Sequence, residues 1–260
     1  MLILPNIWDP LGALLMESLE YPAIATASAS IAYSNGYNDG ENIPFKDLLS
    51  LLKKISSSVN LPVTADIESG YADNDIQLKT NIKLLIDTGI VGINIEDTEK
   101  KTNELRSIEF QCSKISLIRK VSDEMGIPLF INARTDVYLH EKNFSSAEAK
   151  LSEIIKRGLA YKEAGADCFF PIIIKQEEEI KELIAQLKLP INILTIPGIP
   201  DLQTLNKLGV TRVSLGPSLL KIAIRAMKDL AIQLRDYEGL TAITENKVTS
   251  DYLKSLVNNR

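Results

Sequence analysis

Short apolar runs recur along the chain, and each is followed by a longer segment whose apolar residues are spaced for one face of a helix. The runs that we interpret as strands are Leu2–Leu4, Ala23–Ala27, Pro62–Asp66, Val91–Glu96, Leu129–Ala133, Asp167–Ile173, Ile191–Thr195 and Arg212–Leu215. Short runs of this kind, bounded by Gly, Pro or polar residues, are typical of strands that are buried on both faces. The pattern therefore predicts a parallel sheet covered by helices.

The segments between the strands carry Lys and Glu on the face opposite their apolar residues, as amphipathic helices do. The clearest are Phe45–Ser57, Asp75–Asp87, Ser113–Glu124, Ala147–Glu163 and Glu177–Leu187. Eight strand-then-helix units predict an α/β fold, a (β/α)8 TIM barrel, which typically needs about 250 residues. An open doubly wound sheet is the structural alternative, but no G-x-G-x-x-G follows the first strand.

The domain organisation follows from the same pattern. The chain has 260 residues, with no linker or low-complexity tract, so we expect one barrel domain over residues 1–260. Residues 219–260 are more than one barrel helix needs. We expect them to form a C-terminal helical extension that packs on a neighbouring helix or on another subunit.

Composition narrows the class of partner. The chain is 45% hydrophobic and 24% charged, with a net charge of −5, so nothing favours binding to nucleic acid or to an acidic membrane. Two cysteines give no disulfide framework. The start of the sequence lacks the features of a signal peptide, and no apolar stretch approaches the ~20 residues of a membrane span. We expect a cytoplasmic protein.

Acidic residues stand at the ends of two neighbouring strands. Asp66 and Glu68 are two residues apart, so they project the same way from an extended chain, and Glu96 ends the next strand. Such acids repel each other unless a cation lies between them, and oxygen ligands suit Mg²⁺ or Mn²⁺. Helix caps and loop acids are the alternative interpretation of any one of them, but two adjacent acidic strand ends favour a metal site.

Other polar residues follow the strands at the same level. Arg134 leaves the fifth strand, where a guanidinium can bind a carboxylate or neutralise the acids. The segment after the second strand, Ser28–Gly40, is predicted to be a polar loop that brings Asp39 near the metal. The segment Thr98–Glu104 has the profile of a mobile lid or of a plain surface loop. For the lone histidine, His140, we expect a surface or capping role.

These strand ends, taken in order, closely resemble the isocitrate lyase / phosphoenolpyruvate mutase superfamily. The matching motifs are Pro5–Asp9, Ala23–Thr26, Asp66–Tyr71, Gly92–Asp97, Ile131–Asp136, Ala164–Asp167 and Leu208–Ser214. The resemblance covers most of the chain. It implies a homodimer or homotetramer, often with the last helix exchanged between subunits, and a Mg²⁺-dependent enzyme. Such enzymes cleave or rearrange a C–C or P–C bond beside a 2-oxo acid, through an enolate.

The resemblance also implies roles for individual residues. Asp66 would be the direct Mg²⁺ ligand and would lie against the substrate, with Glu68 and Glu96 holding the metal through water. Arg134 would bind the substrate carboxylate, Ser28 and Ala29 would offer backbone donors, and Asp39 would be an acid near the reacting group. Lys101-Thr102-Asn103 resembles the K-T-N lid of the mutase branch, which makes Lys101 and Asn103 candidate catalytic residues.

Two differences from the family's motifs leave the substrate undetermined. The lid has no Cys, unlike the K-K-C-G-H lid of the isocitrate and methylisocitrate lyases, and Ile172 stands where the mutase has a His. The phosphoenolpyruvate mutase and phosphonopyruvate hydrolase side is somewhat favoured by the lid, while a 2-oxo acid decarboxylase or another C–C lyase stays open. One alternative is a Schiff-base aldolase that uses Lys175. Another is a barrel that binds a 2-oxo acid without turning it over.

Overall fold

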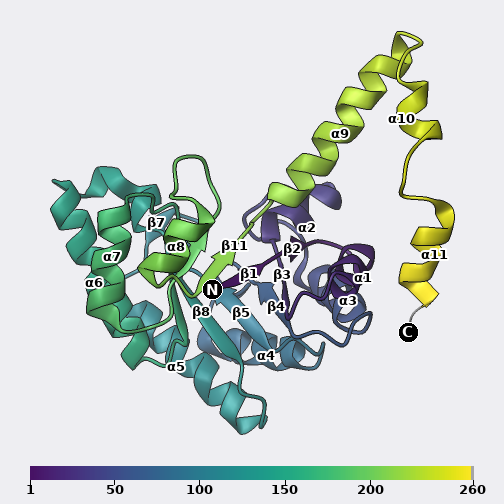
Figure 1. The fold of residues 1–260 in the computed structure, drawn as a ribbon. Coiled ribbons are helices and arrows are strands. Elements are labelled where there is room, and N and C mark those ends of the chain that lie inside the picture. Colours follow the sequence, from purple (N-terminus) through teal and green to yellow (C-terminus); the bar gives the residue numbers. More distant parts are fainter. Residues whose placement is uncertain (259–260) are drawn as a thin grey trace.

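The structure, a computed structural model, describes residues 1–258 and is a closed barrel of parallel strands surrounded by helices (Figure 1). The first strand is in two pieces, β1 (Leu2–Leu4) and β2 (Asn6–Ile7), on either side of Pro5, which has no N–H to donate. The others are β3 (Ile24–Thr26), β4 (Val63–Asp66), β5 (Gly92–Ile95), β8 (Phe130–Thr135), β9 (Cys168–Pro171), β10 (Asn192–Leu194) and β11 (Arg212–Ser214).

The pairing order closes the barrel. One sheet runs β2-β3-β4-β5-β8-β9 and the other runs β1-β11-β10, with all of these pairs parallel. The two sheets are continuous through the first strand on one side. On the other side, an isolated bridge between Phe169 and Ile191 joins β9 to β10. The (β/α)8 barrel is therefore confirmed, and the open doubly wound sheet is wrong.

Helices follow the strands around the barrel. They are α1 (Pro10–Ser18), α2 (Ser28–Ser34), α3 (Phe45–Ser56), α4 (Asp75–Ile86), α5 (Ile108–Glu124), the 3₁₀ helix η1 (Val137–Asn143), α6 (Ala147–Glu163), α7 (Glu177–Leu187) and α8 (Leu202–Leu208). Side chains such as Asn74, Ser107 and Ser146 cap helix N-termini by accepting from backbone N–H groups.

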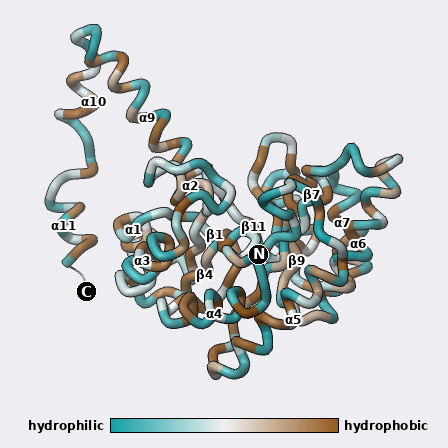
Figure 2. Tube along the Cα trace, turned by 180° about the vertical axis from the view of Figure 1, so that it is seen from behind, coloured by the Kyte–Doolittle hydropathy of each residue, from teal (hydrophilic) through white to brown (hydrophobic). Residues whose placement is uncertain are grey.

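The apolar core lies between the strands and the helices. Figure 2 shows its apolar residues as brown segments of the chain. On β5, Ile93 and Ile95 are fully buried, whereas Asn94 points into the barrel. Because successive side chains of a strand point to opposite faces, the polar residues at every second position point into the barrel interior. The core thus positions polar side chains inside the barrel, toward the ends where the strands finish.

Several predicted boundaries are corrected by the structure. The fifth strand, β8, runs through Thr135, so Arg134 lies within the strand and not after it. The sixth strand, β9, ends at Pro171 and not at Ile173. The predicted loop after the second strand begins as a helix, α2, over Ser28–Ser34. The predicted lid loop contains an antiparallel hairpin, β6 (Thr98–Glu99) with β7 (Glu104–Leu105).

The C-terminal extension leaves the barrel. Helix α9 (Ser218–Arg235) projects outward, and the chain returns through α10 (Leu240–Thr244) to α11 (Ser250–Asn258), which contacts α1 (Figure 1). No side chain of α9 is buried. Among the helices of residues 1–258, none combines the length and apolar character needed to cross a bilayer.

Candidate active site

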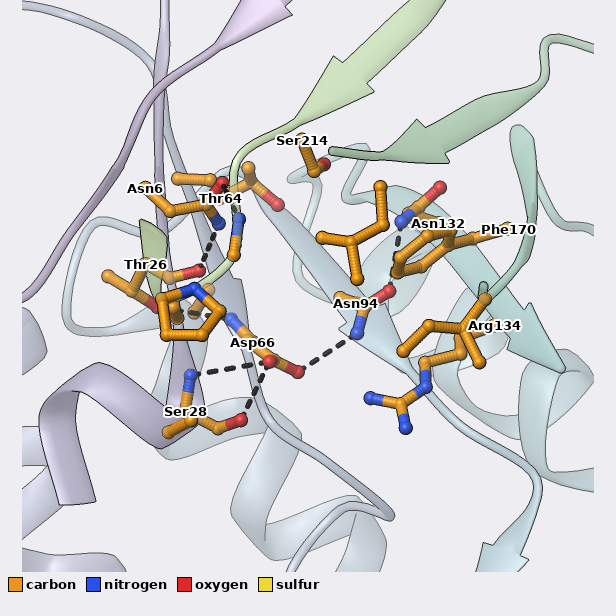
Figure 3. Close-up of a pocket in the computed structure, with 18 of the residues that line it drawn as sticks. Asn6, Thr26, Ser28, Thr64, Asp66, Asn94, Asn132, Arg134, Phe170 and Ser214 are labelled. Atoms are coloured by element: carbon orange, nitrogen blue, oxygen red, sulfur yellow. Dashed lines mark hydrogen bonds between the residues drawn. The ribbon is translucent and has the colours of Figure 1, made fainter. Parts of the chain in front are cut away.

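A cavity of about 200 Å³ lies inside the barrel at the ends of the strands (Figure 3). The first four strands and β8 each contribute polar residues to it, and β9, β10 and β11 close the other side. Its polar lining consists of Asn6, Thr26, Ser28, Asp39, Thr64, Asp66, Asn94, Asn132, Arg134, Arg212 and Ser214. Chemistry in barrels of this type takes place at this end, because the strand-to-helix loops gather there.

Asp66 ends β4 and is held by neutral donors. Its Oδ2 accepts from the Ser28 hydroxyl at 2.8 Å and from the Ser28 backbone N–H at 3.3 Å. Its Oδ1 accepts from the Asn94 amide at 2.9 Å, and Asn94 in turn accepts from Asn132 at 2.9 Å (Figure 3). In residues 1–258 no Lys or Arg lies within ion-pair distance of Asp66, so this carboxylate is oriented and still without a cationic partner.

Glu68 and Glu96 are both almost fully buried, at 2% and 1% exposed. The Nζ of Lys100 lies between them, 3.0 Å from Glu68 and 2.5 Å from Glu96. Glu68 also accepts from the Glu41 backbone N–H at 2.8 Å and from the Tyr71 hydroxyl at 3.1 Å. Lys100 is therefore the cation that allows these two acids to lie side by side.

Burial raises the pKa of Glu96 to about 7, although Arg134 and Lys100 oppose the rise. Burial also raises the pKa of Glu68, again against Lys100. The pKa of Lys100 itself is lowered by burial but raised more strongly by the two glutamates, so the net shift is upward. Asp39 lines the same cavity, and its pKa is raised by desolvation and by Asp66.

Arg134 faces the cavity from β8 with two of its three nitrogens engaged. Its Nε donates to Asp136 at 2.6 Å, and its Nη1 is 2.7 Å from Glu96. Within residues 1–258 no acceptor is bonded to Nη2. The two carboxylates hold the guanidinium in place, and the Nη2 group is left to meet a ligand.

Behind Arg134 is a buried network centred on Asp97, which is 0% exposed. Asp97 accepts from the Thr135 hydroxyl at 2.7 Å, the Asp136 backbone N–H at 2.8 Å, Arg157 at 2.9 Å and the Tyr161 hydroxyl at 2.7 Å. This fixes the backbone at Asp136, whose side chain fixes Arg134. His140 lies at the edge, with its Nε2 3.3 Å from the Thr98 hydroxyl.

The structure does not bring Lys101 and Asn103 to the site. Both are exposed in the turn between β6 and β7, Lys101 pairs with Asp73 at 2.6 Å, and neither lines the cavity. Lys100, in the same hairpin, points toward the buried Glu68 and Glu96 instead. Ser28, Asp39 and Ala29 do line the cavity, although the Ser28 N–H is already engaged by Asp66.

The position of Lys175 does not favour the Schiff-base aldolase alternative. Lys175 is exposed in the segment before α7 and is not part of the cavity, so it lacks the desolvation that makes a lysine nucleophilic. Ile172 does line the cavity, at the end of β9.

The residues present fit a magnesium ion held mainly through water. In residues 1–258 no three His, Cys, Asp or Glu side chains converge into a direct ligand set. Asp66 and Asp39 line the cavity without an ion-pair partner in residues 1–258, and Glu68 follows Asp66 by two residues. A single direct carboxylate suits Mg²⁺, which keeps several of its waters.

Sequence reasoning missed Lys100, Asn94, Asn132, Asp136 and Arg212. A signal was present for most of them. Asn94 precedes Glu96 by two residues, Asn132 precedes Arg134 by two and Asp136 follows it by two, and this spacing places them on the interior face of the same strand or its extension. Nothing local distinguishes Lys100 from Lys101.

Fold and site together define a (β/α)8-barrel enzyme with an acid-and-arginine centre at its strand ends. The chain belongs to the phosphoenolpyruvate phosphomutase family, whose model matches residues 1–235. Relatives named in the comparisons include oxaloacetate decarboxylases and 2-methylisocitrate lyases.

Similar proteins span most of the chain. An uncharacterised protein of Mycobacterium tuberculosis is 30% identical over 238 residues, which cover 92% of this chain and 86% of that protein. The oxaloacetate decarboxylase of Ectopseudomonas mendocina is 29% identical over 245 residues, 90% of this chain and 79% of that enzyme. A crystal structure of a candidate phosphonomutase from Burkholderia cenocepacia J2315 is 34% identical with a TM-score of 0.84, covering 89% and 94% of the two chains.

The fold extends to more distant structures. A phosphonopyruvate hydrolase solved with oxalate and Mg²⁺ is 21% identical and has a TM-score of 0.84, over 100% of this chain and 90% of that one. It shares the fold.

Proposed function

We propose that the protein is a Mg²⁺-dependent enzyme that cleaves or rearranges the C–C or P–C bond beside the carbonyl of a small 2-oxo acid, through an enolate. The observation that carries this is Asp66, an oriented carboxylate without a cationic partner, which shares one cavity with Arg134. Mg²⁺ supplies Lewis-acid stabilisation of the negative charge that develops on the carbonyl oxygen. Mn²⁺ has the same ligand preference and is an alternative.

The protein's own residues bind and orient the substrate. Arg134, with Nε and Nη1 held by Asp136 and Glu96, directs Nη2 at the carboxylate of the 2-oxo acid. Ser28 and Ala29, at the start of α2, border the same ligand. Asp39 lines the same cavity, where burial and Asp66 raise its pKa, and we assign it as the acid near the reacting carbon. These positive and polar groups stand where negative charge develops.

The comparisons support two branches of this chemistry. Relatives named oxaloacetate decarboxylase favour cleavage of a C–C bond, and the family model and the phosphonomutase candidate favour a P–C bond. Oxaloacetate and phosphonopyruvate are therefore the first substrates to assay. Tight ligand binding with no turnover of either, or of related malates, would favour the silent-barrel alternative.

The experiment that tests the site uses oxalate, a mimic of the pyruvate enolate, in isothermal titration with and without Mg²⁺. The wild-type protein should bind oxalate only with Mg²⁺, and Asp66→Ala should weaken that binding at least ~100-fold, because the direct ligand is lost. Asp73→Ala is the matched control, since this exposed acid pairs only with Lys101. Equal binding by the Asp66 variant and the wild type would refute the assignment.

We also propose that the protein acts in the cytoplasm as a homodimer or homotetramer that buries α9 against a second copy. Leu220, Ile224, Met227 and Leu234 form a stripe at helical spacing, and the last three are 53%, 66% and 41% exposed. Such a stripe is typical of an interface. Met227→Glu should shift light-scattering mass toward the monomer, whereas Asp229→Lys on the opposite face should not. A monomeric wild type would refute this proposal.

A further inference from the structure

The turn after β4 contains two residues other than glycine in the left-handed region of backbone conformation. Glu68 has φ +52° and Tyr71 has φ +54°, on either side of Ser69 and Gly70. An L-residue rarely adopts this conformation, and it persists only where the surrounding structure holds it. Such residues cluster at functional sites, and Glu68 is one of the acids assigned to the metal.

Glu41, in the segment between α2 and α3, holds this turn from one side. Its Oε1 accepts from the Ser69 backbone N–H at 2.9 Å, from the Ser69 hydroxyl at 2.7 Å and from the Tyr71 backbone N–H at 3.0 Å. Its own backbone N–H donates to both carboxylate oxygens of Glu68 at 2.8 Å. One residue therefore contacts both the backbone of the turn and the acid that the turn carries.

Lys114, on α5, holds the same turn from another element. Its Nζ donates to the Ser69 carbonyl at 2.9 Å. Burial lowers the pKa of Lys114 to about 8, whereas Glu41 acts in the opposite direction. The N–H, hydroxyl and carbonyl of Ser69 are thus all engaged, the first two by an anion and the third by a cation.

These contacts fix the direction of the Glu68 side chain. Its buried carboxylate meets the Glu41 N–H, the Tyr71 hydroxyl at 3.1 Å and the Lys100 Nζ at 3.0 Å. The carbonyl of Glu68 accepts from the Glu96 backbone N–H at 2.9 Å, so the turn is also tied to the second buried acid. Relaxation of the turn would carry the Glu68 carboxylate away from Lys100 and Glu96.

We propose that Glu41 and Lys114 are positioning residues, which hold Ser69 from two sides and thereby keep the Glu68 carboxylate directed at the water shell of the metal. Neither residue lines the active-site cavity, so both act through Glu68 and not on the ligand. This inference rests on the proposed function, because it takes Glu68 to be an acid of the metal site.

The first test is isothermal titration with Mg²⁺, supported by the electron paramagnetic resonance of Mn²⁺. Glu41→Ala and Lys114→Met should each bind the metal roughly 10-fold more weakly than the wild type, the lower end of the loss seen when an outer partner of a metal ligand is removed. Glu41→Gln should keep part of the affinity, because its amide oxygen can still accept from the turn. The controls are Lys120→Met and Glu124→Ala, exposed positions of the same helix α5, and neither should change the affinity more than about twofold.

A double-mutant cycle separates positioning from a general loss of stability. In Glu68→Gln the acid through which Glu41 acts is gone, so adding Glu41→Ala should weaken Mg²⁺ binding less than about twofold further. An equal loss on adding Glu41→Ala to the wild type and to Glu68→Gln would overturn the proposal.

Hydrogen exchange provides a readout that needs no metal. The amides of Ser69 and Tyr71, followed by nuclear magnetic resonance, should exchange faster in Glu41→Ala, while the amides of β5 keep their rates. Unchanged exchange at both amides would show that Glu41 does not hold the turn. If the wild type binds Mg²⁺ and oxalate but both variants bind the metal as tightly, only this inference fails. If the wild type binds neither, the proposed function fails with it.

Discussion

Replacing Lys100 with Met should tighten the binding of Mg²⁺ and Mn²⁺ to the protein in the absence of substrate. The ammonium group lies 3.0 Å from Glu68 and 2.5 Å from Glu96, the two acids assigned to the water shell of the metal. The metal and Lys100 therefore compete for the same carboxylates. In Lys100→Met this competition is removed, while the length of the side chain is nearly kept.

The magnitude follows from the two contacts. A hydrogen bond to a charged group contributes about 1.5–3 kcal/mol. The Lys100 side chain is 23% exposed, so we discount each contact by about half for solvent screening. Together they contribute about 1.5–3 kcal/mol, and their loss corresponds to roughly 10- to 100-fold tighter metal binding.

The assay is isothermal titration with Mg²⁺, supported by the electron paramagnetic resonance of Mn²⁺. Because burial raises the pKa of Glu96 to about 7, protons also compete at neutral pH, and the titration is done at pH 8.5. Lys101→Met is the matched control, since this neighbour pairs only with the exposed Asp73 and should change the affinity less than about twofold. Weaker or unchanged metal binding by Lys100→Met, with a normal Lys101 control, would refute the competition.

Three further substitutions test the supporting structure. Asp97→Asn breaks a fully buried hydrogen-bond centre, and we expect about 3–5 kcal/mol less stability and a Tm lower by roughly 6–20 °C in calorimetry. Asp136→Ala frees the Nε of Arg134 and should raise KM for the 2-oxo acid more than it lowers kcat, whereas equal changes would argue against a positioning role. Gly158→Ala would place a Cβ 2.6 Å from Leu187, so thermal unfolding should begin at a lower temperature, and an unchanged Tm would contradict this packing.

Much of the fold could be predicted because its signals are local. A strand buried on both faces needs a short apolar run, and an outer helix needs one apolar face, so both are visible within a few residues of sequence. The acids at Asp66, Glu68 and Glu96 could be grouped for a related reason. In a parallel barrel all strands end at one rim, so neighbouring strand ends converge.

Tertiary structure decided the details that depend on distant partners. The chain itself determined the barrel, the acidic rim and the presence of Arg134. Only the folded hairpin showed that Lys100 turns inward and Lys101 outward, because two adjacent lysines have the same local pattern. Only strand register placed Arg212 in the cavity with Asp66, because the strands that carry these two residues are far apart in sequence. Local sequence patterns determine on which face of a strand or helix a residue lies. Long-range packing determines which other residues that face contacts.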